Sequence, residues 1–95
     1  MTEDDIRYIH AVAAEELHVN PLDGSRRQPC VLARAFAAEI AREHGASTPQ
    51  VGRALGRDHT TVLNYRSIVD GMRAWPQVYA NDLRHLDNIR NHITL

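Results

Sequence analysis

The stretch Gly56-Arg57-Asp58-His59-Thr60-Thr61-Val62-Leu63 constrains the fold more than any other part of the chain. Gly56 can supply a turn that a residue with a Cβ would resist. Asp58 is a good N-cap, because its carboxylate can accept hydrogen bonds from the backbone N–H groups of Thr60 or Thr61. Val62 then begins an apolar stripe. The stretch therefore predicts a tight turn that leads into a helix with a polar first turn.

A second, short helix is predicted directly upstream, over residues 48–55. Ser47 is its expected cap, and Gln50 three residues later completes a capping box. Two helices joined by a tight turn form a helix-turn-helix, here over about residues 47–70, whose second helix enters the DNA major groove by its N-terminal end. The side chains expected to read base edges there are Asp58, His59, Thr60, Thr61 and Asn64. The alternative for Asp58 is a purely capping role, and for the two threonines an ordinary place in a first helical turn.

The charge distribution supports a nucleic-acid partner. The net charge of −1 argues against one at first sight. Residues 1–25, however, carry a net charge of −5, residues 26–66 carry +4, and residues 67–95 are balanced. Positive charge is thus concentrated around the helix-turn-helix, as expected of a DNA-binding surface. All 11 basic residues are Arg, which suits bidentate contacts to phosphate and guanine.

Three stretches give the chain a resemblance to a known family. Residues 57–63 (Arg-Asp-His-Thr-Thr-Val-Leu) resemble the signature of the C-terminal DNA-binding domain, domain IV, of DnaA, the bacterial chromosome replication initiator. Residues 34–43 resemble the preceding helix of that family, and Ser25-Arg26-Arg27 resembles its basic loop. The resemblance extends from about residue 6 to residue 86. It implies an all-α, compact bundle of five to six helices with a helix-turn-helix of the DnaA and Trp-repressor-like type.

The resemblance also implies how DNA contacts are divided. In the family an Arg of the basic loop enters the minor groove, which corresponds to Arg26 here, with Arg27 as a close alternative; narrow minor grooves attract guanidinium groups. Helix N-termini offer N–H groups to phosphates. The residues expected to contact the DNA backbone are Arg34, Arg42, Thr48, Pro49, Gln50, Arg53 and Arg57. The chain departs from the family at Thr48 and Ala35, and at Gly56, where a glycine pair is usual. These departures bear on which DNA sequence it prefers.

The remaining segments predict the scaffold of one domain over residues 1–95, long enough for a core without metal or disulfide. One helix is expected from a cap at Thr2 to about Leu17, and another from Pro29 to His44 with Arg34 and Arg42 facing solvent. The recognition helix is expected to end near Val69, followed by a break over residues 71–76. A closing helix should begin at Trp75-Pro76, with Trp75 as a core anchor. Its apolar stripe is expected to comprise Val78, Leu83, Leu86 and Ile89.

Several function classes are disfavoured by the residues. No nucleophile–base–acid set or Gly-rich phosphate loop is present, and His10, His18, His85 and His92 lack the spacing and partners of a metal site. An enzyme, a cofactor and a small-molecule substrate are therefore not expected. A single cysteine, Cys30, suits a reducing compartment, and no apolar run reaches membrane-span length. We expect a cytoplasmic, nucleoid-associated protein of a bacterium or phage.

Three functions stay open at this point. The ATPase module that drives origin melting in DnaA is not part of these 95 residues. The chain can be a regulator of transcription, alone or as the DNA-binding module of a larger and phage-related regulator. It can instead bind replication origins through DnaA boxes, as an initiator fragment or a competitor. Third, it can be a protein-interaction module that retains the fold and uses the acidic first helix. Double-stranded DNA is the expected partner, with transcription or replication proteins as further ones.

Overall fold

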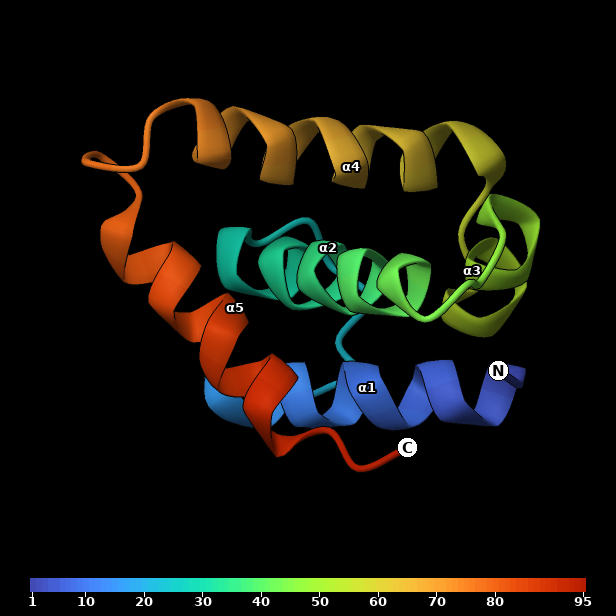
Figure 1. Cartoon of the computed structure of the whole chain (residues 1–95). Helices are drawn as coiled ribbons and strands as arrows, with labels where there is room; N and C mark the ends of the chain where they lie inside the picture. Colours follow the sequence, from blue (N-terminus) through green and yellow to red (C-terminus); the bar gives the residue numbers. More distant parts are fainter.

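A computed structural model describes residues 1–95 and contains five α-helices and no strand. The helices are α1 (Glu3–Glu16), α2 (Gln28–Glu43), α3 (Thr48–Leu55), α4 (His59–Ala74) and α5 (Ala80–His92). In Figure 1, α2 lies in the middle with α1 on one side and α4 on the other, while α3 closes one end and α5 crosses the other. The predicted all-α bundle with a helix-turn-helix is confirmed. No helix combines the length and the apolar character needed to cross a membrane.

The core is built around α2. Every residue from Leu32 to Ala41 is buried, including those on the sides of the helix that a surface helix would expose to water. A helix enclosed on all sides is central to its domain, and the alanines of α2 let α1 and α4 approach it closely. The largest fully buried side chains come from four different helices and pack together around α2: Phe36, Ile6, Ile9, Ile40, Leu86, Ile89 and Val69.

Local signals place most of the helix ends where they were predicted. Thr2 and Asp5 form a complete capping box at the start of α1. The Ser47 side chain accepts from the Gln50 backbone N–H at 3.3 Å. The predicted capping box at this helix is nevertheless wrong, because the Gln50 side chain donates to the Met1 carbonyl instead of returning to Ser47. Gln50 thereby connects α3 to the beginning of the chain.

The C-terminal third differs from the prediction. Helix α4 continues through Gly71 to Ala74, and α5 begins only at Ala80, so the predicted break and the predicted start of the closing helix are both wrong. Pro76 ends the helical path, since the residue before a proline is disfavoured in helical geometry. Trp75 is 64% exposed and Val78 is 71% exposed, so neither anchors the core. Both lie in the connection, because the apolar stripe that packs on the bundle starts further along α5.

Candidate nucleic-acid interface

The turn between α3 and α4 is held by direct backbone contact. The Arg57 N–H donates to the Gly52 carbonyl at 2.9 Å. A Cβ on Gly52 would lie 2.7 Å from the Arg57 carbonyl oxygen, which is closer than real Cβ atoms come. Gly56 ends α3 in the left-handed region with φ of 66°. Gly52 therefore permits the close approach of the turn and Gly56 supplies its left-handed conformation, and together they set the point at which α4 begins.

The N-terminal end of α4 faces outward. Its inward stripe is Val62, Tyr65, Val69 and Met72. His59, Thr60 and Asn64 are exposed, and Thr61 is half-buried. The predicted base-reading side chains are thus gathered on the first two turns of one helix and are accessible from outside. Hydroxyl, imidazole and amide groups in this position can form hydrogen bonds with base edges.

Asp58 is the N-cap of α4, as predicted. Its Oδ1 accepts from the Thr61 backbone N–H at 2.8 Å. This backbone hydrogen bond is the main reason that the pKa of Asp58 lies below its ordinary value. The side chain is therefore an anion that only accepts hydrogen bonds, and a carboxylate has about four lone-pair sites. Capping the helix leaves acceptor capacity for a cytosine amino group, so the two roles considered for Asp58 are compatible.

The basic loop lies against the helix-turn-helix. It belongs to the segment between α1 and α2, which passes behind α2 in Figure 1. The Arg57 Nη2 donates to the Gly24 carbonyl at 2.9 Å, which connects the loop directly to the turn before α4. Arg27 pairs with Asp23 at 3.5 Å. Arg26 is exposed and has no such partner, so of the two loop arginines Arg26 is the freer to meet a ligand.

Arg34 does not lie where it was predicted. It is 3% exposed, and its guanidinium donates to the Tyr65 hydroxyl at 3.0 Å, the Asp23 carbonyl at 3.0 Å and the Ser25 carbonyl at 2.6 Å. The outward orientation predicted for Arg34 is wrong, and a guanidinium so enclosed does not reach a phosphate. The physical reason is the central place of α2, whose middle is covered by α4 and by the loop.

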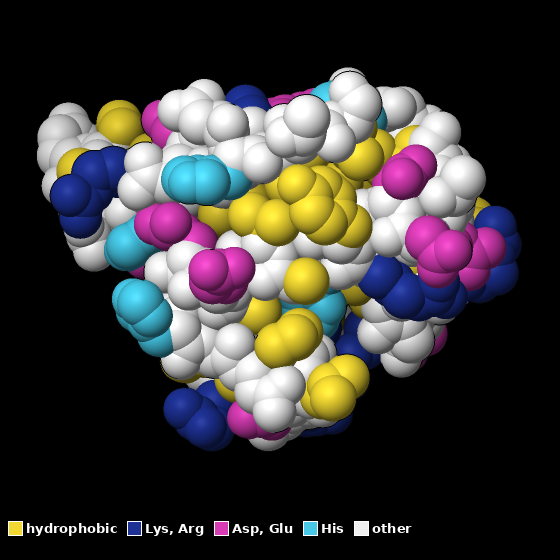
Figure 2. Space-filling view, turned by 90° about the horizontal axis from the view of Figure 1, so that it is seen from below, with side chains coloured by type: hydrophobic (Ala, Val, Ile, Leu, Met, Phe, Trp, Pro, Cys, Tyr) yellow, Lys and Arg dark blue, Asp and Glu magenta, His cyan; other side chains and the backbone are white.

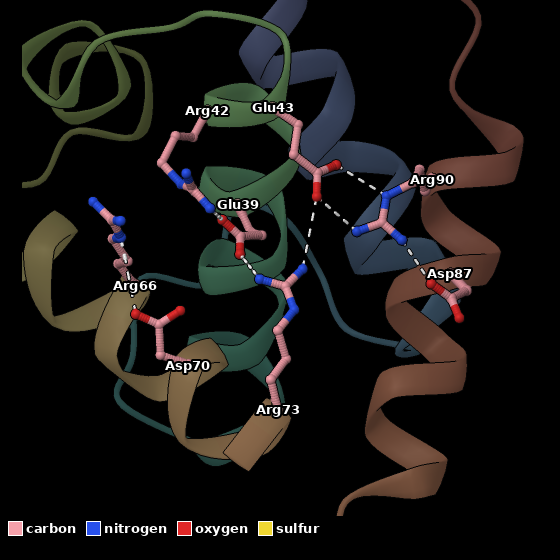
Figure 3. A network of polar contacts seen from close by, with 8 residues as sticks. All are labelled: Glu39, Arg42, Glu43, Arg66, Asp70, Arg73, Asp87 and Arg90. Atoms are coloured by element: carbon pink, nitrogen blue, oxygen red, sulfur yellow. Dashed lines mark hydrogen bonds and ion pairs between the residues drawn. The ribbon is translucent and has the colours of Figure 1, made fainter. Parts of the chain in front are cut away.

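Arg42 is partly engaged within the protein (Figure 3). Its Nε donates at 2.8 Å to Glu39, a buried carboxylate that also accepts from Arg73 on α4. Burial alone would raise the pKa of Glu39, but hydrogen bonds from the two guanidinium groups outweigh it and the pKa is lowered. The Arg42 side chain is still 44% exposed, so one side of it faces solvent. Figure 3 also shows Arg66 beside Asp70 on α4. The distance from Arg66 Nε to Asp70 Oδ2 is 3.9 Å.

The start of α3 has fewer backbone N–H groups available to a phosphate than the sequence suggested. Pro49 has no N–H, and the Gln50 N–H is taken by Ser47, so the Thr48 amide is the one left for a phosphate among these three. Arg53 approaches Glu3 on α1 at 3.4 Å and is largely exposed. Arg57 has a buried Nε without a hydrogen-bond partner, beside the Nη2 that holds Gly24.

Two residues of this region were missed by sequence reasoning. Tyr65 and Glu39 are both buried and both accept hydrogen bonds from arginines. A signal was present, since Tyr65 stands three residues after Val62 and Glu39 three residues after Phe36, and both of these are core residues. A polar group at the spacing of a buried helical stripe needs a partner. That spacing predicts burial, but it does not name the partner.

The face opposite α4 has a different character. Figure 2 views this face and shows histidine and acidic side chains mixed with apolar ones. A surface groove of about 500 Å³ there is lined by Tyr8, Val12, Glu15, Glu16, His18, His85 and His92. Glu16 lies 2.7 Å from His85 and accepts from Asn88, and the hydrogen bond with His85 is the main cause of its lowered pKa. No group of side chains on the chain has the arrangement of a metal site.

Comparison with known families agrees with this geometry. The family described as the bacterial dnaA protein helix-turn-helix matches residues 6–68, which run from α1 into α4 and make up well over half of the chain. No curated protein and no solved structure matches the chain. The matched residues include the basic loop, α3, the turn and the outward-facing start of α4. The chain therefore belongs to the family of bacterial DnaA helix-turn-helix domains.

Proposed function

We propose that the chain binds double-stranded DNA in a sequence-specific manner and regulates transcription, alone or as the DNA-binding module of a larger regulator. The observation that carries the proposal is the bond between Arg57 and the Gly24 carbonyl, which joins the basic loop to the start of α4. A minor-groove arm and a major-groove helix need such a fixed relation to read one site. The proposed major-groove readers are Asp58, His59, Thr60, Thr61 and Asn64, and Arg26 or Arg27 is the proposed minor-groove reader.

The proposed backbone contacts are fewer than the sequence suggested. Arg53 is largely exposed, Arg57 is partly exposed, and the Thr48 amide is free. Arg42 is a further proposed phosphate contact, because one side of its side chain faces solvent. Phosphate contacts of this kind position a protein on the duplex, while base contacts specify the sequence.

Binding to replication origins is the second candidate, and one observation favours it. Residues 57–63 keep the family signature without interruption and stand at the start of α4. Against this, the departures at Thr48 and Ala35, together with the inward Arg34, alter the surroundings of that signature. We therefore place recognition of a different site first and recognition of the DnaA box second.

Fluorescence anisotropy tests the proposal and separates the two candidates. Labelled duplexes would carry a DnaA box, a scrambled box, or the site recovered by selection from random sequence, each at two salt concentrations. Preference for the selected site over the box supports the transcription regulator, and preference for the box supports origin binding. Both should weaken with salt, since counterions are released from phosphates. Absence of binding to all three at moderate salt contradicts the proposal.

Two substitutions test the division of contacts. Thr61→Ala should weaken the specific complex by about 1–3 kcal/mol and leave binding to random DNA almost unchanged. The backbone part of the helix cap survives this change, because the Thr61 backbone N–H donates to Asp58 whichever side chain stands at position 61. Arg53→Ala should weaken both complexes and flatten the salt dependence. It is a cleaner test than Arg42→Ala, which also removes a partner of buried Glu39. If the two variants behave alike, the assigned roles are wrong.

A substitution on the acidic helix α1 tests the alternative role in protein interaction. Glu16 is already engaged by His85 and Asn88, whereas Glu15 is exposed. Glu15→Gln therefore changes the surface without disturbing the packing of α1 on α5. We expect it to leave DNA binding unchanged; loss of function in this variant, with Thr61→Ala silent, would favour the interaction module.

A further inference from the structure

Arg34 is a buried cation without a carboxylate partner. Its three hydrogen bonds go to the Tyr65 hydroxyl, the Asp23 carbonyl and the Ser25 carbonyl, all of them uncharged oxygens. A buried charge of this kind is costly unless its N–H groups are satisfied. The guanidinium fork meets this need because it presents several donors in fixed directions, which the single ammonium of Lys cannot do. Arg34 therefore depends on the positions of both the loop and α4.

Two guanidinium groups together hold three consecutive carbonyls of the loop. Arg34 binds the carbonyls of Asp23 and Ser25, and Arg57 binds the carbonyl of Gly24 between them. The loop has further internal bonds, from the Ser25 N–H to the Asp23 side chain and from the Arg27 N–H to the Ser25 side chain. Arg26 follows directly after the third held carbonyl. The backbone directly before Arg26 is thus held against the protein by the hydrogen bonds from Arg34 and Arg57.

The third bond of Arg34 reaches the recognition helix. Tyr65 is 3% exposed and belongs to the inward stripe of α4, one turn after half-buried Thr61. From these contacts we infer that Arg34 is a positioning residue, which sets Arg26 at a fixed distance from the N-terminal end of α4 so that both grooves are read in register. This inference rests on the proposed function and adds to it a residue that does not touch DNA.

A double-mutant cycle tests the inference. Binding to the selected duplex would be measured for the wild-type chain, Arg26→Ala, Arg34→Lys and the double variant, and the same cycle would be run with Thr61→Ala in place of Arg26→Ala. We expect Arg26→Ala to weaken binding about tenfold in the wild-type background and less than about threefold beside Arg34→Lys. Thr61→Ala should weaken binding by the same factor in both backgrounds.

The outcomes separate positioning from general stability. Equal losses for Arg26→Ala in the two backgrounds overturn the inference, and so does an Arg26→Ala variant that binds like the wild-type chain. If Arg34→Lys reduces the effects of Arg26→Ala and Thr61→Ala alike, its role is only structural and the inference fails. Failure of the proposed function is a different result, namely no preference of the wild-type chain for any duplex.

A second variant and a measurement without DNA keep the test decisive if Arg34→Lys does not fold. Tyr65→Phe removes only the hydroxyl that accepts from Arg34. Trypsin should cut after Arg26 or Arg27 several-fold faster in Tyr65→Phe than in the wild-type chain, because the loop is released. Ile89→Val is the matched control, since Ile89 is fully buried on α5 and has no part in the loop. Equal cleavage of Tyr65→Phe and Ile89→Val overturns the inference.

Discussion

Gly52→Ala should destabilise the protein, although alanine is ordinarily the better helix former. The new Cβ would lie 2.7 Å from the Arg57 carbonyl oxygen, which is backbone and cannot swing away as a side chain can. Overpacking of this kind costs about 1–3 kcal/mol. Replacing glycine inside a helix returns at most about 1 kcal/mol. We therefore expect a net loss of up to about 2 kcal/mol in the free energy of unfolding, as the difference of those two terms.

Gly71→Ala is the matched control on the next helix. Gly71 lies inside α4, and a Cβ there would meet nothing within 4 Å. The helix-propensity gain is unopposed at this site, so the variant should be more stable by about 0.5–1 kcal/mol. Both glycines are replaced by the same residue inside a helix, but Gly52 is buried against the Arg57 backbone whereas Gly71 is exposed.

Urea unfolding followed by circular dichroism measures both changes. The midpoint should fall for Gly52→Ala and rise for Gly71→Ala, with the slope unchanged if the unfolding remains two-state. In a thermal scan each kcal/mol corresponds to about 4–8 °C for a domain of this size. If Gly52→Ala proves as stabilising as Gly71→Ala, the backbone contact between α3 and the turn is not what holds the helix-turn-helix together.

Three further predictions follow from the polar contacts. Asp58→Ala should lower the melting temperature, because it removes the helix cap. Asp58→Asn should leave the melting temperature almost unchanged, because asparagine also caps helices. If Asp58→Asn nevertheless weakens specific binding, the base-reading role of Asp58 is the cause. Glu39→Gln should cost about 1–3 kcal/mol in urea unfolding at neutral pH. The difference from the wild-type chain should shrink in acid, since the lowered pKa of Glu39 stabilises the fold above the ordinary carboxyl range and this stabilisation is lost as the pH falls. His10, whose pKa is lowered by burial and then by Arg34 and Arg57, should make the wild-type chain less stable as the pH drops below the ordinary histidine range, and His10→Gln should flatten that part of the stability curve.

Features decided within a few residues were predictable from the sequence. The caps at Thr2, Ser47 and Asp58 and the left-handed Gly56 act through bonds that span three or four residues, so the residue types at these positions indicate them directly. The end of α4 was not predictable in this way. A glycine inside a helix costs only about 1 kcal/mol, and the burial of Met72 beyond it offsets that cost. Trp75 is exposed for the same reason, because the longer α4 places it beyond the end of the core.

Arg34 shows what lay beyond local reasoning. Arginine is seldom buried, so an Arg in a helix is read as exposed. Its acceptors, however, stand 9, 11 and 31 residues away along the chain, and no window of sequence contains them. Two of the three acceptors are backbone carbonyls, as is the acceptor of Arg57 in the loop. The bonds from Arg34 and Arg57 therefore do not depend on the side chains of the loop, although Asp23 and Ser25 add side-chain bonds of their own. Because the bonds from Arg34 and Arg57 reach only backbone atoms of the loop, we expect that Arg26 and Arg27, the proposed minor-groove readers, are the positions at which related chains can alter this recognition without losing its register with α4.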